Sequence, residues 1–174
     1  VTMEKKITFV NEEGEELVGS LHAPEKEARF GVILGHCFTC SRHTRILQRI
    51  GKDLASAGYM ALRFDFSGNG QSEGEFTQST FSKQISEIET AADLLAEKGV
   101  DRLGLVGHSM GATIAILTGA QLETVQGVCA IAGRSESAGA FKFLSEKQRE
   151  ELDRTGKVTF ESRGRSLALT ETFF

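Results

Sequence analysis

The hydrophobic positions of this chain form short apolar runs separated by segments with helical spacing. Residues 4–10 alternate between apolar and polar side chains, and residues 16–22 indicate a second strand after the turn at residues 11–14. The chain is therefore predicted to begin with a β-hairpin. Residues 29–36 then form a continuous apolar run, which is typical of a strand buried on both faces of a parallel sheet.

Strand and helix patterns alternate after this run. Residues 42–57 have apolar positions at helical spacing and stop at Gly58, and residues 81–95 predict a second helix that ends before Gly99. Further strands are predicted over residues 59–66, 102–106 and 125–132, the last as a buried strand. This order favours an α/β fold with a mostly parallel sheet, helices on both faces, and ligands beyond the carboxyl ends of the strands.

The pattern changes past the last of these strands. Residues 141–153 are polar with helical spacing, and residues 157–161 and 166–170 predict a second hairpin. We therefore divide the chain into an α/β core, residues 1–133, and a helix-plus-hairpin segment, residues 134–174, that would lie above the strand ends as a lid. A surface insertion without a catalytic role is the alternative interpretation.

The segment with the clearest chemistry is Gly107-His108-Ser109-Met110-Gly111, which fits G-x-S-x-G between an apolar strand and a helical pattern. In such a nucleophile elbow the serine hydroxyl projects from a tight strand-to-helix corner, and the flanking glycines avoid steric collision. Ser109 is therefore the candidate nucleophile. The Met110 amide, at the start of the helix, is a candidate donor to an oxyanion. An ordinary glycine-rich turn is the alternative.

Length, composition and charge narrow the function classes. A chain of 174 residues with 40% hydrophobic content suits one domain with one sizeable core. The net charge of −4, with lysine and arginine scattered among the acids, gives no basic stripe for nucleic acid and no polybasic segment for a membrane surface. No apolar run is long enough to span a bilayer or to act as an export signal, so a cytoplasmic location is expected.

The chain has three cysteines, which are too few for a disulfide framework. We expect free thiols in a reducing compartment, with Cys129 in the core of an apolar strand. Cys37 and Cys40 form a C-x-x-C pattern bracketed by His36 and His43, which taken alone could bind zinc or act as a redox pair. Because no second ligand pair exists, no metal site is expected.

The loop after the strand at residues 59–66 is too rich in glycine for regular structure. Asp65 is expected to order this loop by accepting hydrogen bonds from backbone N–H groups. The glycines at residues 68–70 do not have the G-x-G-x-x-G spacing of a dinucleotide-binding loop, so no cofactor is expected.

Three motifs in this order resemble the α/β-hydrolase superfamily. They are GHCF at residues 35–38, DFSGNGQS at residues 65–72 and the elbow itself, and the resemblance covers essentially the whole chain. The details are most similar to small bacterial serine esterases of the cinnamoyl or feruloyl type. They are also similar to hydrolases fused to OsmC-like domains, whose HCFTCS stretch resembles residues 36–41.

The resemblance implies an α/β-hydrolase fold, truncated after the sixth strand, and a serine carboxylic ester hydrolase that needs no cofactor or metal. It implies that Ser109 is the nucleophile, that the backbone N–H groups of Phe38 and Met110 form the oxyanion hole, and that the segment after the sixth strand is a lid over the acyl pocket. Small or aromatic esters are the expected substrates.

The acid and the histidine of the family's triad come after the serine in the chain. This sequence has four histidines: His22, His36, His43 and His108. None follows Ser109, and Glu136 is the only carboxylate near a strand end after it. We therefore expect the acid and the base outside these 174 residues, in a longer hydrolase. A hydrolase fold reduced to a binding or assembly module is the alternative, and an uncovered last strand predicts a homodimer or swapped assembly.

Overall fold

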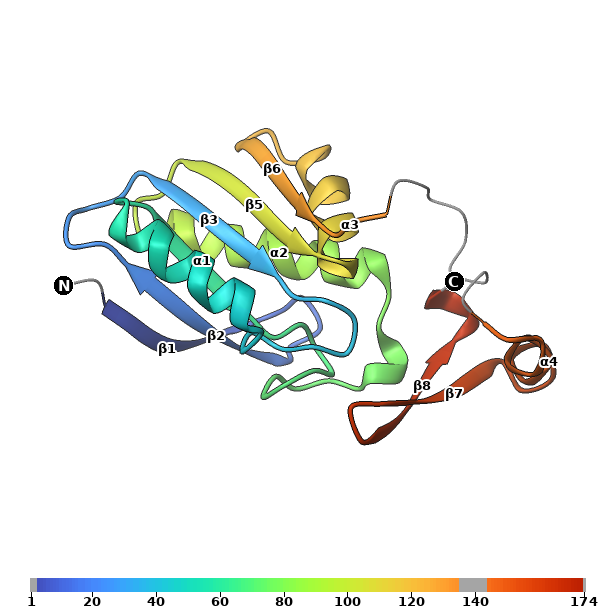
Figure 1. Ribbon diagram of the computed structural model, residues 1–174. Coiled ribbons are helices and arrows are strands. Elements are labelled where there is room, and N and C mark those ends of the chain that lie inside the picture. Colours follow the sequence, from blue (N-terminus) through green and yellow to red (C-terminus); the bar gives the residue numbers. More distant parts are fainter. Residues whose placement is uncertain (1–2, 135–143, 174) are drawn as a thin grey trace.

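The computed structural model of the chain describes residues 3–134 and 144–173 (Figure 1). Its main layer is a six-stranded sheet in the order β1-β2-β4-β3-β5-β6. The strands are β1 (Met3–Val10), β2 (Glu16–Ala23), β3 (Phe30–Gly35), β4 (Met60–Phe64), β5 (Arg102–His108) and β6 (Val125–Ile131).

The pairing of the strands follows the sequence pattern closely. β1 and β2 form the N-terminal hairpin, and β2 pairs antiparallel with β4. The next strands, β4, β3, β5 and β6, are parallel to their neighbours. The α/β class and the hairpin followed by alternating strands and helices are therefore confirmed.

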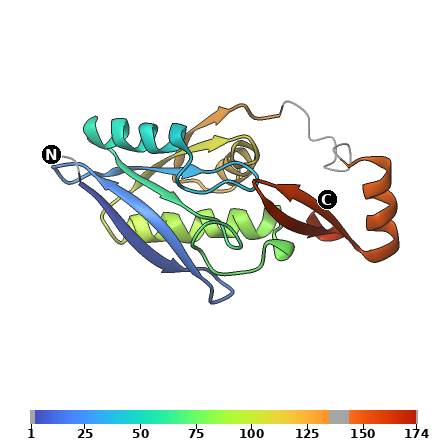
Figure 2. The same ribbon diagram turned by 60° about the horizontal axis from the view of Figure 1, so that its bottom comes forward.

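Helices cover both faces of the sheet (Figures 1 and 2). They are α1 (Arg45–Ser56), α2 (Phe81–Ala96) and α3 (Met110–Gly119). On one face, Leu47 of α1 packs with Val32 and Val106. On the other, Ile88 of α2 and Ile114 of α3 belong to a larger apolar cluster that includes the side chains of β4 and β5. This burial is the main favourable term for the fold.

β6 differs from the prediction of a buried strand. Its residues from Gln126 to Ala130 are exposed, Val128 to 39%, and Cys129 is exposed instead of lying in the core. The physical reason is position in the sheet. In the described part of the chain β6 pairs with β5 alone, and α3 covers only part of it, so an apolar sequence does not by itself place a strand in the interior.

A smaller unit follows at residues 144–173, which we call the C-terminal unit. It contains α4 (Glu146–Thr155), β7 (Lys157–Ser162), β8 (Arg165–Thr170) and a short 3-10 helix (Glu171–Phe173). Ser145 and Gln148 form a capping box at the start of α4, and Gly156 ends it in the left-handed conformation. The predicted helix and hairpin are confirmed where the structure describes them; residues 141–143 lie outside the described ranges.

The C-terminal unit has an apolar centre of its own. Leu152, Val158 and Leu169 are buried there together with Phe76, which comes from the 3-10 helix Phe76–Gln78 of the core. In both views the β7–β8 turn reaches back toward the loop that follows β3 (Figures 1 and 2). The C-terminal unit is thereby packed beside the carboxyl ends of the central strands.

Candidate active site

Ser109 lies at the corner between β5 and α3. Its φ is 55° and its ψ is −114°, a backbone conformation that residues other than glycine rarely adopt. The Ser109 N–H donates to the Ile131 carbonyl at 2.9 Å, which ties the corner to the end of β6. A strained serine at this position is the geometry of a nucleophile elbow.

The flanking glycines are required by close backbone contacts. A Cβ atom at Gly107 would lie 2.0 Å from the Gly111 carbonyl oxygen, and one at Gly111 would lie 2.3 Å from the Gly35 carbonyl oxygen. Neither backbone can move aside without opening the corner. The steric explanation predicted for these glycines is therefore confirmed, and the same contacts place the end of β3 against the elbow.

The two candidate oxyanion donors come from these adjacent segments. Met110 is the first residue of α3, where the helix has no earlier carbonyl to receive its amide, and Phe38 lies in the loop after β3. Within residues 3–134 and 144–173, neither amide donates a hydrogen bond to a protein acceptor. Both groups are thus available, and their role in holding an oxyanion stays a prediction.

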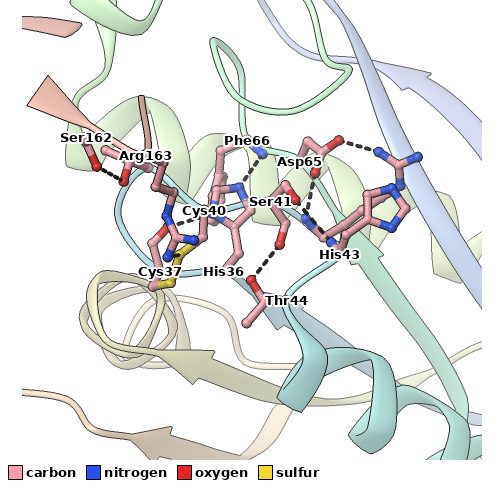
Figure 3. The surroundings of a disulfide bond; sticks show 12 residues. His36, Cys37, Cys40, Ser41, His43, Thr44, Asp65, Phe66, Ser162 and Arg163 are labelled. Carbon is pink, nitrogen blue, oxygen red and sulfur yellow. Dashed lines mark hydrogen bonds and ion pairs between the residues drawn. A yellow bond between two sulfur atoms is a disulfide. The ribbon is translucent and has the colours of Figure 1, made fainter. Parts of the chain in front are cut away.

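The loop that carries Phe38 is closed by a disulfide bond between Cys37 and Cys40 (Figure 3). Their Cα atoms are 5.2 Å apart, and the Cys40 N–H donates to the Cys37 carbonyl at 3.0 Å. The expectation of free thiols at these positions is therefore wrong. A tight turn with Thr39 at a φ of 58° brings the two side chains within bonding range, which counting cysteines does not reveal.

His36 is fully buried under this loop. Its Nδ1 is 2.8 Å from the Cys37 carbonyl oxygen, and its Nε2 accepts a hydrogen bond from the Phe66 N–H at 3.1 Å. The ring is therefore neutral with its proton on Nδ1, and burial lowers its pKa. With both nitrogens occupied, His36 positions the loop and does not serve as a base.

None of the other histidines hydrogen-bonds Ser109 either. The Nε2 atom of His22 accepts a hydrogen bond from Arg63 at 2.8 Å, and His43 is exposed on the surface. His108 precedes the serine, and its buried Nδ1 has no hydrogen-bond partner among the residues that the structure describes. Glu136, the acid considered from the sequence, lies outside the described residues.

Asp65 orders the glycine-rich loop as predicted. It is completely buried; its Oδ1 accepts from the Arg42 N–H at 2.6 Å and its Oδ2 from the Gln71 N–H at 3.0 Å. The Arg42 guanidinium forms an ion pair with the same carboxylate. The stability of a buried charge depends strongly on the partner that neutralises it. The contacts between Asp65 and Arg42 therefore hold together the loop after β3 and the loop after β4.

The turn between β7 and β8 contacts the disulfide loop, which no local pattern in the sequence indicates. The hydroxyl groups of Thr39 and Ser162 are 2.8 Å apart. The Arg165 guanidinium donates to the Thr39 carbonyl at 3.4 Å, and the Arg163 guanidinium lies 3.2 Å from the Cys40 sulfur. The sequence does not identify these arginines as functional residues, because all that it shows is that they lie in a polar turn.

Aromatic side chains accompany these contacts. The ring of Phe38 is stacked on Phe160 at a centroid distance of 5.4 Å and lies edge-on to Phe76 at 5.6 Å. Phe173 also contacts Phe38, at 5.8 Å. An apolar aromatic surface therefore adjoins the candidate oxyanion amide.

No group of three or more histidine, cysteine, aspartate or glutamate side chains is placed to hold a metal ion in the described part of the chain. Among the helices of those same ranges, none has the length and apolar character needed to cross a lipid bilayer.

A mixed sheet with a serine elbow between β5 and α3 defines an α/β-hydrolase. Residues 27–148 match the family described as serine aminopeptidase, S33, and since that is more than half of the chain, this chain belongs to that family of the α/β-hydrolase superfamily. No curated protein sequence gives a significant match.

Solved structures are similar over most of the chain. A protein from Agrobacterium vitis S4 assigned to the hydrolases aligns with a TM-score of 0.80 and 23% identity, covering 99% of this chain and 70% of its own. The esterase Pf2001 of Pyrococcus furiosus aligns with a TM-score of 0.65 and 26% identity, covering 74% and 51%. Est1E of Butyrivibrio proteoclasticus, solved with ferulic acid bound, aligns with a TM-score of 0.70 and 21% identity, covering 92% and 66%.

These alignments confirm the α/β-hydrolase fold predicted from the three motifs. The chain spans between 51% and 70% of the length of these three structures.

Proposed function

We propose that this chain carries the nucleophile of a serine hydrolase that cleaves carboxylic esters through an acyl-enzyme. The observation that carries the proposal is the conformation of Ser109, whose φ of 55° is held between glycines that admit no side chain. A fold retains about 1–3 kcal/mol of such strain where the geometry serves a purpose. Membership of a serine hydrolase family supports the same assignment.

In the proposed reaction the Ser109 hydroxyl attacks the acyl carbon and loses its proton to a base. The carbonyl oxygen becomes an oxyanion that accepts hydrogen bonds from the backbone N–H groups of Phe38 and Met110. The ester C–O bond breaks, the alcohol leaves with the proton, and water then hydrolyses the acyl-enzyme.

The base is assigned to a histidine, paired with an acid, that this sequence does not contain. His36 is excluded because both ring nitrogens are hydrogen-bonded, and the Nε2 atom of His22 accepts a hydrogen bond from Arg63. Among the described residues no hydrogen bond joins His43 to Ser109. His108 adjoins Ser109 in sequence, but no acid within residues 3–134 and 144–173 hydrogen-bonds its Nδ1 to orient the ring.

We assign the acyl group of the substrate to the aromatic surface around Phe38. The Phe160 and Phe173 rings belong to the C-terminal unit, so this unit acts as the lid over the acyl group. Small or aromatic acyl groups fit apolar walls of this kind better than charged ones.

The test is to treat the protein, isolated at the length at which cells make it, with a fluorophosphonate, and to measure intact mass. An adduct at Ser109, absent from Ser109→Ala, is the expected result, because only a serine activated by a base reacts quickly. Turnover of p-nitrophenyl acetate, a methyl ferulate ester and an aminoacyl p-nitroanilide then separates an esterase from an aminopeptidase. Faster hydrolysis of the anilide would contradict the ester assignment.

A second candidate function is a non-catalytic binding or assembly module. The exposed edge of β6 favours it, since Val128 is 39% exposed there and Ile116 of the neighbouring α3 is 49% exposed. Light scattering distinguishes the two candidates together with the labelling experiment. A dimer without fluorophosphonate labelling would support assembly, and a labelled monomer would contradict it.

A further inference from the structure

The Cys37–Cys40 disulfide borders a cavity that is separate from the elbow. The cavity has a volume of about 330 Å³ and is lined by the loop between β3 and α1, by Gly70 of the loop after β4, and by the β7–β8 turn with the first residue of β8. Cys40 is one of the lining residues, whereas Cys37 and Ser109 are not. Cys40, which is 6% exposed, therefore forms part of the wall of a space large enough for part of a small molecule.

The lining of this cavity is positively charged. Arg163 and Arg165 contribute guanidinium groups, Ser41 and His43 are polar, and none of the lining residues is acidic. Among the described residues neither arginine forms an ion pair with a carboxylate. Two positive charges that no carboxylate of the described residues pairs with attract anions to the cavity and raise their local concentration.

Arg163 also contacts the sulfur itself. Its guanidinium is 3.2 Å from Cys40 Sγ, and Figure 3 shows its side chain reaching from the β7–β8 turn to the disulfide. A cation at this distance favours the thiolate over the thiol and lowers the free energy of the reduced form. In the described ranges, no cation is found in the same relation to Cys37.

We propose that Cys37 and Cys40 form a redox-active pair that exchanges with a small thiol bearing carboxylate groups. The carboxylates bind the guanidinium groups of Arg163 and Arg165, which places the thiolate of the small molecule beside Cys40. Charge complementarity selects an anionic thiol in preference to a neutral or cationic one.

The exchange is balanced in two steps. In the first, the thiolate of the small molecule attacks Cys40 Sγ; the bond between Cys37 and Cys40 breaks, and its electron pair leaves with Cys37, which takes up a proton. In the second, another molecule of the same thiol attacks the outer sulfur of the mixed disulfide. This releases Cys40 as a thiolate next to Arg163 and forms the disulfide of the small molecule. The protein is reduced by two electrons, and two thiols are oxidised.

The experiment measures reduction of the disulfide by reduced glutathione, which is anionic, and by cysteamine, which carries an ammonium group and no carboxylate. A Cys129→Ser background removes the exposed third thiol. The protein is oxidised with glutathione disulfide, mixed with each thiol, quenched with iodoacetamide and weighed intact. Rates are compared per thiolate and corrected for the dependence of thiolate nucleophilicity on the thiol pKa, so that the different acidities of the probes cancel.

We expect glutathione to react about tenfold faster than cysteamine at low salt, and the ratio to approach one at high salt, where surface charges are screened. The double substitution of Arg163→Gln and Arg165→Gln should bring the ratio of the two rates close to one at low salt. The matched control Arg154→Gln, which removes an exposed arginine of α4 away from the cavity, should preserve it.

Equal rates for the two probes, or a ratio that does not respond to salt, would overturn the proposal. So would protein in which both cysteines stay fully alkylatable after oxidation. The salt dependence is measured on protein with both arginines intact, so it decides the question even if the double variant does not fold. None of these readouts depends on hydrolase activity, and the proposal does not rest on the function assigned to Ser109.

Discussion

The carbonyl oxygen of Gly111 lies 2.0 Å from the point at which a side chain at Gly107 would begin, so the corner around Ser109 closes only if residue 107 is glycine. This contact lies between the end of strand β5 and the first turn of helix α3. The position of the candidate nucleophile is therefore set by backbone sterics, and hydrogen bonds add to it.

The first prediction concerns this contact. Gly107→Ala should destabilise the protein by more than about 4 kcal/mol, or prevent soluble protein from accumulating. The reason is that the added methyl group would overlap with the backbone of Gly111, which cannot move without opening the corner. Gly127→Ala is the matched control, because a Cβ atom at this β6 position meets nothing within 4 Å. Thermal denaturation of both variants is the measurement. Similar melting temperatures for the two would contradict the steric account.

The second prediction concerns the strain at Ser109 itself. Ser109→Gly should be more stable than Ser109→Ala by about 1 kcal/mol, because glycine adopts a φ of 55° and a ψ of −114° without strain. Both variants lack the hydroxyl, so the comparison isolates the backbone. Urea unfolding measures the difference, and an equal or lower stability of the glycine variant would show that the corner is relaxed.

The third prediction concerns the buried ion pair of Asp65 and Arg42. Asp65→Asn should lower the free energy of unfolding by about 3–5 kcal/mol, because it leaves the Arg42 charge buried without its partner. Asp53→Asn removes the exposed partner of Arg49, one helical turn away on α1, and should have no measurable effect. If urea midpoints move equally in the two variants, burial is not the deciding factor.

The fourth prediction is a loss of stability in acid. Burial lowers the pKa of His36, and burial together with Arg63 lowers the pKa of His22, both below the ordinary value of 6.5. The unfolded chain therefore binds protons near pH 6.5 that the folded chain does not. Their contribution to stability is complete above that pH and declines as the pH falls below it.

The measurement for this acid effect is the free energy of unfolding at about pH 7.5 and pH 5.5. His36→Gln should reduce the difference between the two values, since glutamine does not titrate. His22→Gln should reduce the difference as well, since burial also lowers the pKa of His22. If the free energy of unfolding changes by the same amount between the two pH values in all three proteins, other groups cause the acid effect.

The fifth prediction joins the disulfide to the proposed hydrolase reaction and rests on that proposal. Phe38 lies inside the ring closed by Cys37 and Cys40, so reducing the bond should loosen the amide that holds the oxyanion. Fluorophosphonate labelling of Ser109 should slow by about tenfold, less than the loss of a whole oxyanion donor. The Cys37→Ser, Cys40→Ser protein should match the reduced form. Unchanged labelling would separate redox state from catalysis.

The fold and the elbow could be predicted from the sequence because both depend on local patterns. The run at residues 29–36 and the helical spacing before Gly58 determine β3 and α1, and G-x-S-x-G determines the corner at Ser109. Asp65 was also assigned correctly, since short polar side chains after a strand commonly order the following loop.

The remaining features depend on contacts between distant segments. Arg163 reaches Cys40 across more than a hundred residues of sequence, and nothing near either residue indicates the approach. Cys129 has the neighbours of a core residue but lies on an edge strand, and edge position is a property of the whole sheet. Charge at the cavity and exposure at β6 could therefore not be predicted from pattern alone.

The turn at the tip of the C-terminal hairpin has an evolutionary consequence. Arg163 and Gly164 are its two central residues, both with positive φ, and Ser162 pairs with Arg165 across it. The side chains of Arg163 and Arg165 are exposed, so substitutions that suit the turn change the charge presented to the cavity without altering the interior. Changes at these positions can therefore alter which small molecules are attracted to Cys40 during evolution. The corner that holds Ser109 stays the same, because close backbone contacts constrain it.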